Sequence, residues 1–512
     1  MFRRPPLPRA LADGAVDVLH PLVTVSRGVR RLSARTRQTW DRTPKDRRGP
    51  LVLMGMTAVL VVGLVPYGPV LALLGLMAAA GWAGRGEPAL AAGPDPAGAE
   101  RLQTLYDALV PYFSVPQDTD PLYRHGGEWQ AAFDEHAFDD SGRLVRLRLR
   151  YPAYFTDAEP ESRARVEQLL RSKSGRGREY LFAWDEEGNR LEVSVLPPLP
   201  GDIPAQRFVT SAGETVLGFT DPAGMPRTLP LTGADGTGPR DVPAVVWRTG
   251  SRSTEQHLLV LGQPSSGVTT LLRSIALQAL HTGDVLVMDG AGTADYAFLT
   301  GRSGVLAVES GLTGTLATLE WAAHETERRL IATNRARQLG HALPGDVHRP
   351  LWIIVDRPTE LSRLASADRR TDPQRLLEVP LRQGRAANVT VVVADQCDSA
   401  EALALPVLTH TRARVLLGVA GPDQVRAVLG APPRTTPVDE VPPGRGYVRL
   451  GGGPVHRLQV PATPDPFDPG AAEPLRRAVL ELLPEPTGPV EEAPDGRRPD
   501  DDGALPATAS SP

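Results

Sequence analysis

Residues 257–276, HLLVLGQPSSGVTTLLRSIA, decide the fold of this 512-residue chain. The apolar run 258–261 predicts a short buried strand, and the apolar spacing after the following loop predicts a helix. The loop itself has the spacing Gly262-x-x-x-x-Gly267-x-Thr269. A strand, a glycine loop and a helix in this order are typical of a phosphate-binding P-loop, where backbone N–H groups and the helix N-terminus face an anion. Taken alone, the stretch also fits an ordinary strand–turn–helix connection.

The loop departs from the P-loop motif at Val268. This position should carry the lysine that reaches the β- and γ-phosphates. A loop of this shape can still hold a phosphate through its backbone, but it lacks the side-chain charge that most such sites use.

Composition allows two or three domains and a real core beside long linkers, with 50 glycines, 51 prolines and 41% hydrophobic residues. Only Lys45 and Lys173 are lysines, so 54 of the 56 basic residues are arginine, which indicates codon bias in a high-GC bacterium. The net charge of −4 does not indicate nucleic-acid binding by the whole molecule. The single cysteine, Cys397, excludes a disulfide framework and fits a reducing cytosol.

The N-terminal part has the features of a membrane anchor. Residues 1–48 form a basic segment, and residues 51–83 contain no charged side chain. We predict a transmembrane segment at 51–83 that places the protein in the bacterial cell membrane, with the lipid bilayer as a partner. The Pro66–Pro69 break favours a helical hairpin, with a single bent helix as the alternative. The basic flank orients the N-terminus to the cytoplasm, and a hairpin leaves the rest of the chain on the same side.

Three further segments lie outside the main domain. Residues 84–98 form a linker, and 99–200 are predicted to be a small α/β module. In this module we expect a strand at 144–149, a helix at 159–170 and a hairpin at 180–196; its arginines fit a solvated face better than a polyanion site. Residues 463–512 form a Pro-rich and acidic tail that we expect to be largely disordered, with one short helix near 473–483.

Residues 206–462 form the predicted main domain. It begins with short β patterns such as 214–220, and from Leu258 onward apolar β runs alternate with helical patterns, which predicts a parallel, doubly wound sheet. The predicted strands are 258–261, 285–288, 351–355, 389–393 and 414–419, and the predicted helices are 269–280, 314–339, 373–386 and 422–429. The third strand ends in Asp356. In P-loop NTPases such a carboxylate holds Mg²⁺ opposite the loop hydroxyl, here Thr269. The next position usually carries a glutamate that polarises the attacking water, but here it is Arg357, and Glu360 lies four residues after the aspartate.

Three further stretches carry a specific resemblance. Residues 325–329, ETERR, are similar to an E-M-E-R-R helix, and residues 382–396, RQGRAANVTVVVADQ, are similar to an A-R-A-x-G-I-x-L-x-x-A-T-Q stretch. Residues 443–449, PGRGYVR, resemble a closing G-x-G-x-hydrophobic strand. With the P-loop they make the chain from about 214 to 460 resemble the motor domain of the FtsK/SpoIIIE family of membrane-anchored double-stranded-DNA translocases. The layout is most similar to that of the TraB-type plasmid-transfer members.

The resemblance implies a RecA/HerA-like P-loop NTPase fold, a homo-oligomeric, hexameric ring, and ATP and Mg²⁺ as cofactors if the site is functional. It also implies Thr269 and Asp356 as metal ligands and Gln396 as the γ-phosphate sensor. Arg385 either reaches the nucleotide of a neighbouring subunit or is a surface arginine. The residues implied around the phosphates are Gly262, Gln263, Pro264, Ser265, Ser266, Gly267, Val268, Thr269 and Thr270.

Two departures from the family pattern separate the functional hypotheses. Val268 removes a phosphate-stabilising charge, and Arg357 removes the water-orienting carboxylate. We therefore expect impaired ATP hydrolysis, a pseudo-ATPase scaffold in a DNA-translocation or conjugal-transfer system. One alternative is an active ATP-driven double-stranded-DNA translocase. The other is an FtsK-like component of a type VII-like protein secretion assembly. The expected partner is double-stranded DNA or another FtsK-like subunit.

Overall fold

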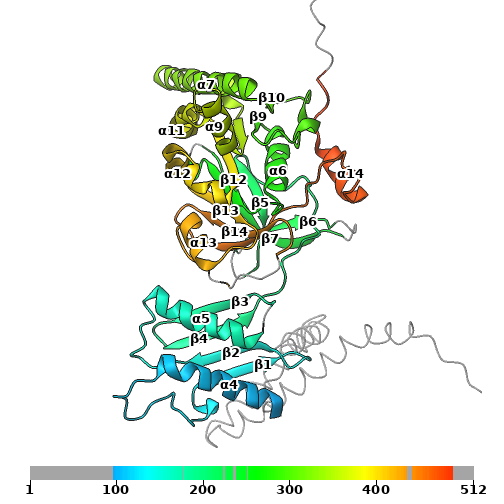
Figure 1. Ribbon diagram of the computed structural model, residues 1–512. Coiled ribbons are helices and arrows are strands. Elements are labelled where there is room, and N and C mark those ends of the chain that lie inside the picture. The colour runs from blue at the N-terminus through cyan, green and yellow to red at the C-terminus, as the bar shows by residue number, and fades with distance from the viewer. Residues whose placement is uncertain are drawn as a thin grey trace, which may run out of the picture. The chain divides into compact units, whose positions relative to one another are not determined.

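The computed structural model describes residues 96–487, apart from 176, 223–224, 226, 234–237, 251, 434 and 436–440 (Figure 1). The predicted basic segment, the transmembrane segment 51–83 and almost all of the linker lie outside the described residues. Within the described ranges, no helix is long and apolar enough to cross a membrane. From Ala97 onward the described residues belong to one compact unit that contains two sheets.

The first sheet forms the small α/β module. Its four antiparallel strands lie in the order β1-β2-β4-β3 and pack with two helices around a separate apolar core. The elements are α4 (Pro96–Phe113), β1 (Phe133–Phe138), β2 (Leu144–Arg150), α5 (Pro160–Ser174), β3 (Tyr180–Asp185) and β4 (Arg190–Val195). The structure confirms the predicted strand, helix and hairpin, and adds α4 and β1. Arg146 and Arg148 of β2 pair with Glu192 at 2.5 and 3.4 Å, so cross-strand acids offset much of the basic face.

The second sheet has eleven strands in the order β10-β9-β11-β12-β8-β13-β14-β15-β5-β7-β6. The six strands from β10 to β13 are parallel, as predicted, but the remaining five are antiparallel, so the fold is a mixed sheet and not a purely parallel one. The strands are β5 (Glu214–Phe219), β6 (Thr228–Leu231), β7 (Arg240–Arg248), β8 (Leu258–Gly262), β9 (Asp284–Asp289), β10 (Val305–Glu309), β11 (Leu351–Asp356), β12 (Val389–Gln396), β13 (Ala413–Leu417), β14 (Arg445–Leu450) and β15 (His456–Gln459).

Helices cover both faces of the parallel half (Figure 1). The helices are α6 (Val268–Leu280), α7 (Leu312–Leu339), α8 (Gly345–His348), α9 (Pro358–Ala367), α10 (Pro373–Leu376), α11 (Glu378–Ala387), α12 (Leu405–His410) and α13 (Pro422–Leu429). The predicted helix 373–386 is two helices, α10 and α11. Pro380 lacks an N–H and lies in the first turn of α11, where no intrahelical donor is required.

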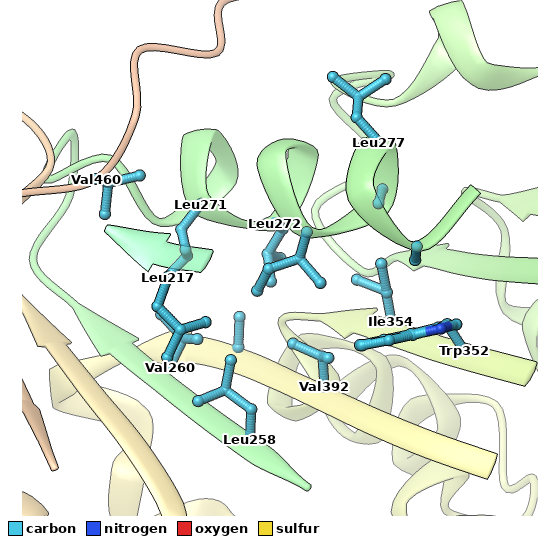
Figure 2. Packing of buried hydrophobic residues seen from close by; sticks show 14 of the residues in the cluster. Leu217, Leu258, Val260, Leu271, Leu272, Leu277, Trp352, Ile354, Val392 and Val460 are labelled. Carbon is cyan, nitrogen blue, oxygen red and sulfur yellow. The ribbon is translucent and has the colours of Figure 1, made fainter. Parts of the chain in front are cut away.

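Alternate residues of each parallel strand face opposite helical layers. Leu258 and Val260 pack with α6, whereas Leu259 and Leu261 pack with α7, α9 and α11. Figure 2 shows Leu271 and Leu272 of α6 directed toward the side of the sheet that carries Leu258 and Val260. Burial on both faces explains why these strands are continuous apolar runs in the sequence.

The described part of the C-terminal tail differs from the prediction. The predicted short helix is confirmed as α14 (Glu473–Leu482), and its Val479 is buried in the same core as α6. Beyond it, Ser303 N–H donates to Glu485 O at 2.9 Å, and Thr487 N–H donates to Gly301 O at 2.8 Å. The expectation of disorder therefore does not hold for 463–487, because this stretch buries apolar side chains and pairs its backbone.

Candidate nucleotide-binding site

The loop between β8 and α6 has the backbone of a P-loop. Gly267 has φ 97° and Ser265 has φ 61°, so the chain turns through the left-handed region twice before the helix begins at Val268. The first helical N–H bond after the loop runs from Leu271 to Gly267 O at 3.0 Å. The preceding N–H groups of the first turn have no intrahelical acceptor, which is the arrangement that receives an anion at a helix N-terminus.

Neighbouring strands hold this loop in place. Gly444 N–H, just before β14, donates to Ser266 O at 2.7 Å, and Gln263 N–H donates to Leu417 O of β13 at 3.2 Å. A side chain on Gly267 would place its Cβ 2.7 Å from Gly444 N, which is closer than nonbonded contact allows. Glycine is therefore required at 267 both for its positive φ and for the close approach of Gly444.

Val268 turns back over the start of the loop. A methyl group on Gly262 would collide with Val268 Cγ2 and would lie 2.5 Å from Ser266 Oγ. The Val268 side chain also packs against the apolar core beside α6. The position that supplies a cation in an ordinary P-loop therefore supplies an apolar contact here.

The predicted polar residues meet at the carboxyl edge of the parallel sheet, where open α/β sheets bind ligands. Gln396, at the end of β12, is the register partner of Gly262 on β8. Asp356, at the end of β11, is the partner of Asp289 on β9 and of Ala394 on β12. By strand alternation, Asp356, Asp289 and Gln396 share the face that α6 covers. The register thus places Asp356 and Gln396 on one face, while the roles expected of them stay predictions.

Asp356 already has a partner that sequence reasoning missed. The Tyr296 hydroxyl, from the segment between β9 and β10, donates to Asp356 Oδ2 at 2.6 Å, and only 1% of Tyr296 and 5% of Asp356 is exposed. Burial raises the pKa of Asp356 to about 6; the Tyr296 hydrogen bond opposes this rise, the nearby Asp289 adds to it, and Arg357 opposes it. No motif in the sequence marks Tyr296, because the contact joins residues 60 positions apart.

Arg357 occupies the position expected for the catalytic glutamate, with φ 54°. Its positive charge lowers the pKa values of Asp356 and Asp395, against the larger effect of burial in each case. Glu360 does not replace the missing carboxylate at this position, because it lies on α9, is paired with Arg363 at 2.7 Å and is substantially exposed. The water-orienting carboxylate of the family pattern therefore has no equivalent at either of these two positions.

Two arginines that could supply a positive charge lie elsewhere. Arg385 is exposed on α11, which ends just before β12 begins. It therefore lies toward the amino edge of the sheet, away from the 262–267 loop of the same chain. Arg273 of α6, a candidate for replacing the missing charge, is buried and engaged. Its guanidinium donates to the backbone oxygen and to Oδ1 of Asp295, both at 2.9 Å. A role for Arg385 at a neighbouring subunit stays a prediction.

The residue types fit Mg²⁺ in part. Thr269 supplies a hydroxyl on the first turn of α6 and Asp356 a carboxylate, and Mg²⁺ usually completes its shell with water and substrate phosphates. The Tyr296 hydrogen bond, however, occupies one oxygen of that carboxylate. Among the described residues, no group of three or more His, Cys, Asp or Glu side chains is arranged to hold a metal ion.

The sequence matches no protein-family model and no curated protein. Among solved structures, the chain is similar to the pCW3 conjugation coupling protein TcpA, in its monomer form with ATPgS. That match has a TM-score of 0.44 and 14% identity and covers 75% of this chain and 99% of that one.

Two further solved structures are also similar. The cytoplasmic domain of the Thermomonospora curvata secretion ATPase EccC has a TM-score of 0.37 and 23% identity over 52% of this chain and 34% of that one. EssC (ATPases 2 and 3) from Geobacillus thermodenitrificans has a TM-score of 0.40 and 15% identity over 56% and 52%. Similarity at this level carries no functional argument, so the P-loop architecture rests on the strand order and the loop geometry.

Proposed function

We propose that this chain is a membrane-anchored, FtsK/SpoIIIE-like protein of a DNA-translocation or conjugal-transfer system that acts as a pseudo-ATPase scaffold. The observation that supports the proposal is the contrast within one site. The loop backbone of 262–267 is complete and braced, whereas Val268, Arg357 and Tyr296 each replace or occupy a group needed for hydrolysis.

The three changes act on different steps. An apolar Val268 leaves the phosphates without a charge that is normally worth several kcal/mol in such sites, on the order of 3 kcal/mol for one oriented donor. Arg357 leaves the attacking water without an orienting carboxylate and puts a cation beside Asp356. The Tyr296 hydroxyl competes with the metal for that same carboxylate. Weak ATP binding through the backbone, with negligible turnover, is the expected result.

The proposal extends to partners and location. The chain forms a homo-oligomeric, hexameric ring or joins a ring of another FtsK-like subunit, and its ligands are ATP and Mg²⁺ bound weakly. Double-stranded DNA is the proposed substrate of the assembly. The uncharged run 51–83 anchors the protein in the bacterial cell membrane, with the motor domain facing the cytoplasm.

Nucleotide turnover tests the central claim. Full-length protein is assayed for ATP binding by equilibrium titration and for phosphate release with and without duplex DNA. We expect weak binding and no stimulated release. Turnover near or above about one per second, in the ordinary range for enzymes, contradicts the scaffold and supports the active translocase instead.

A double variant, Val268→Lys with Arg357→Glu, serves as the matched gain-of-function control. Because the two changes flank one phosphate, their effects on hydrolysis should be strongly non-additive. Restored hydrolysis in the double variant shows that the remaining geometry is that of a motor. No hydrolysis in either protein indicates a fold retained only for assembly.

Fractionation tests the location. Full-length protein should sediment with membranes and require detergent, whereas a version that begins near Glu100 should stay in the supernatant. A reporter fused at Gly98 distinguishes the two topologies. A hairpin leaves Gly98 in the cytoplasm, whereas a single span places it outside the membrane. Full-length protein in the soluble fraction after high-speed centrifugation would overturn the anchor.

A further inference from the structure

The segment 289–304, which carries Tyr296, is fixed at its start by Asp289. The Asp289 carboxylate accepts hydrogen bonds from the N–H groups of Ala291, Gly292 and Ala294 at 3.0–3.1 Å. Ala294 has φ 60°, a left-handed conformation that a residue with a side chain rarely adopts and that surrounding contacts must hold. The segment therefore keeps its shape, and with it the Tyr296–Asp356 bond, only while its contacts persist.

Residues 463–487, which we name the strap, are linked to the segment 289–304 at two places, once through Arg273 of α6 and once directly. Near the middle of the segment, Arg273 of α6 bonds Asp295 at 2.9 Å and lies 3.8 Å from Asp465 of the strap, so this link is indirect. Near the end, Ser303 N–H donates to Glu485 O at 2.9 Å and Thr487 N–H donates to Gly301 O at 2.8 Å.

Side chains strengthen the contact at the end of the segment. The Thr487 hydroxyl also donates to Gly301 O at 2.8 Å, and the Arg302 guanidinium donates to Pro484 O at 3.3 Å. Residues 484–487 thus form a short antiparallel pairing with 301–303, just before the edge strand β10.

The middle of the strap shares a core with Tyr296. Val479 of α14 is fully buried in the cluster that contains Tyr296, Phe298 and Leu299, and Leu482 and Leu483 pack partly against the same cluster. The strap therefore completes the same core in which the Tyr296 ring is buried. Loss of the strap is therefore expected to loosen the segment.

We propose that the strap is an autoinhibitory element that locks Tyr296 onto Asp356 and so withholds the metal-binding carboxylate. Its release lets the 289–304 segment move and frees Asp356 for a nucleotide-bound divalent cation. The consequence for the cation rests on the proposed nucleotide site, but the lock itself rests only on the contacts above.

Two truncations isolate the lock. One version of the full chain ends after Thr487, and the other ends after Leu483, so they differ only in Pro484, Glu485, Pro486 and Thr487. Hydrogen–deuterium exchange is followed for backbone amides of 289–304. We expect exchange of the amides of 291–297 to be at least about tenfold faster in the shorter version, because lost strap contacts favour local opening.

The control truncation should exchange at the wild-type rate. Tyr296→Phe removes the hydroxyl alone; it should accelerate exchange in 291–297 while leaving the amides of α14 unchanged. If the shorter truncation accelerates only the amides of 301–303, the strap does not control Tyr296 and the proposal is overturned.

ATP titration of the same proteins, with Mg²⁺ and with EDTA, tests the consequence. The shorter truncation and Tyr296→Phe should each bind ATP about tenfold more tightly than wild type with Mg²⁺, and no more tightly with EDTA. Tighter binding in Tyr296→Phe but not in the truncation removes the strap from the explanation. If no version binds ATP, the proposed nucleotide site fails, and the exchange data alone decide whether the lock exists.

Discussion

The loop after β8 is held by backbone atoms, whereas the strand end at Asp356 is held by side chains. At the loop, Gly444 N–H and Leu417 O fix the chain without any side chain, and Gly267 is required by a close backbone approach. At the strand end, the environment of Asp356 depends on Tyr296 and Arg357. Backbone geometry survives substitution of the surrounding side chains, so a loop can keep its shape when those side chains change.

The largest effect is expected from Gly267→Ala. The added Cβ would lie 2.7 Å from Gly444 N, and alanine would have to adopt φ 97°. The energetic cost of overpacking and the cost of a left-handed alanine therefore add. We expect a loss of about 3–4 kcal/mol in the free energy of unfolding, measured by denaturant titration.

Gly340→Ala is the matched control for that change. Gly340 ends α7 with φ 66°, and an added Cβ would meet nothing within 4 Å. It should cost only about 1 kcal/mol. Equal losses for the two variants would show that contact with Gly444 does not brace the loop.

Asp356→Asn should stabilise the protein above neutral pH. The pKa of Asp356 is raised from its ordinary value near 3.8 to about 6, so the folded state binds more protons than the unfolded state between these values. Stability contributed by the protonated group is complete below about pH 4 and is lost as pH rises through about 6. Asparagine keeps an acceptor for Tyr296 and carries no charge.

Melting curves from pH 4 to pH 8 measure this effect. The variant should match wild type near pH 4 and exceed it by at most about 2–3 kcal/mol at pH 8. A constant difference across this range would mean that Asp356 does not titrate there, and that burial does not oppose its charge as the structure indicates.

Val268→Lys should raise ATP affinity by about tenfold, or about 1.4 kcal/mol, because the backbone cradle and Thr269 are already present. Val268→Met, which is of comparable length without a charge, is the control and should leave affinity near that of wild type. The measurement is titration with a fluorescent ATP analogue. Equal affinities for the two variants would show that a cation at 268 does not reach the phosphates.

The smallest effect is expected at Arg357, whose φ is 54°. Glycine tolerates this conformation and alanine does not, so Arg357→Gly should be more stable than Arg357→Ala by about 1 kcal/mol. Thermal unfolding of the two variants measures the difference. If alanine is the more stable, the backbone at the strand end is not strained, and Arg357 is retained for its side chain alone.

Local pattern predicted the elements that are buried on both faces. The runs 258–261, 351–355 and 389–393 match β8, β11 and β12 closely, because a central parallel strand leaves no solvent-facing position for a polar residue. The edge strand β10 and the antiparallel strands β6 and β7 were not assigned from the sequence. They are partly exposed or interrupted by loops, so their apolar content is a weaker signal.

The sequence by itself determined the P-loop backbone and the loss of two charged groups, because glycine spacing and residue identity are local properties. Only the tertiary structure decided that Val268 packs over Gly262 and that Tyr296 occupies Asp356. It also decided that the strap pairs with 301–303. These contacts arise from the packing of the sheet and its helices, and most of them join segments far apart along the chain. Local spacing in the sequence does not encode which residues that packing brings together.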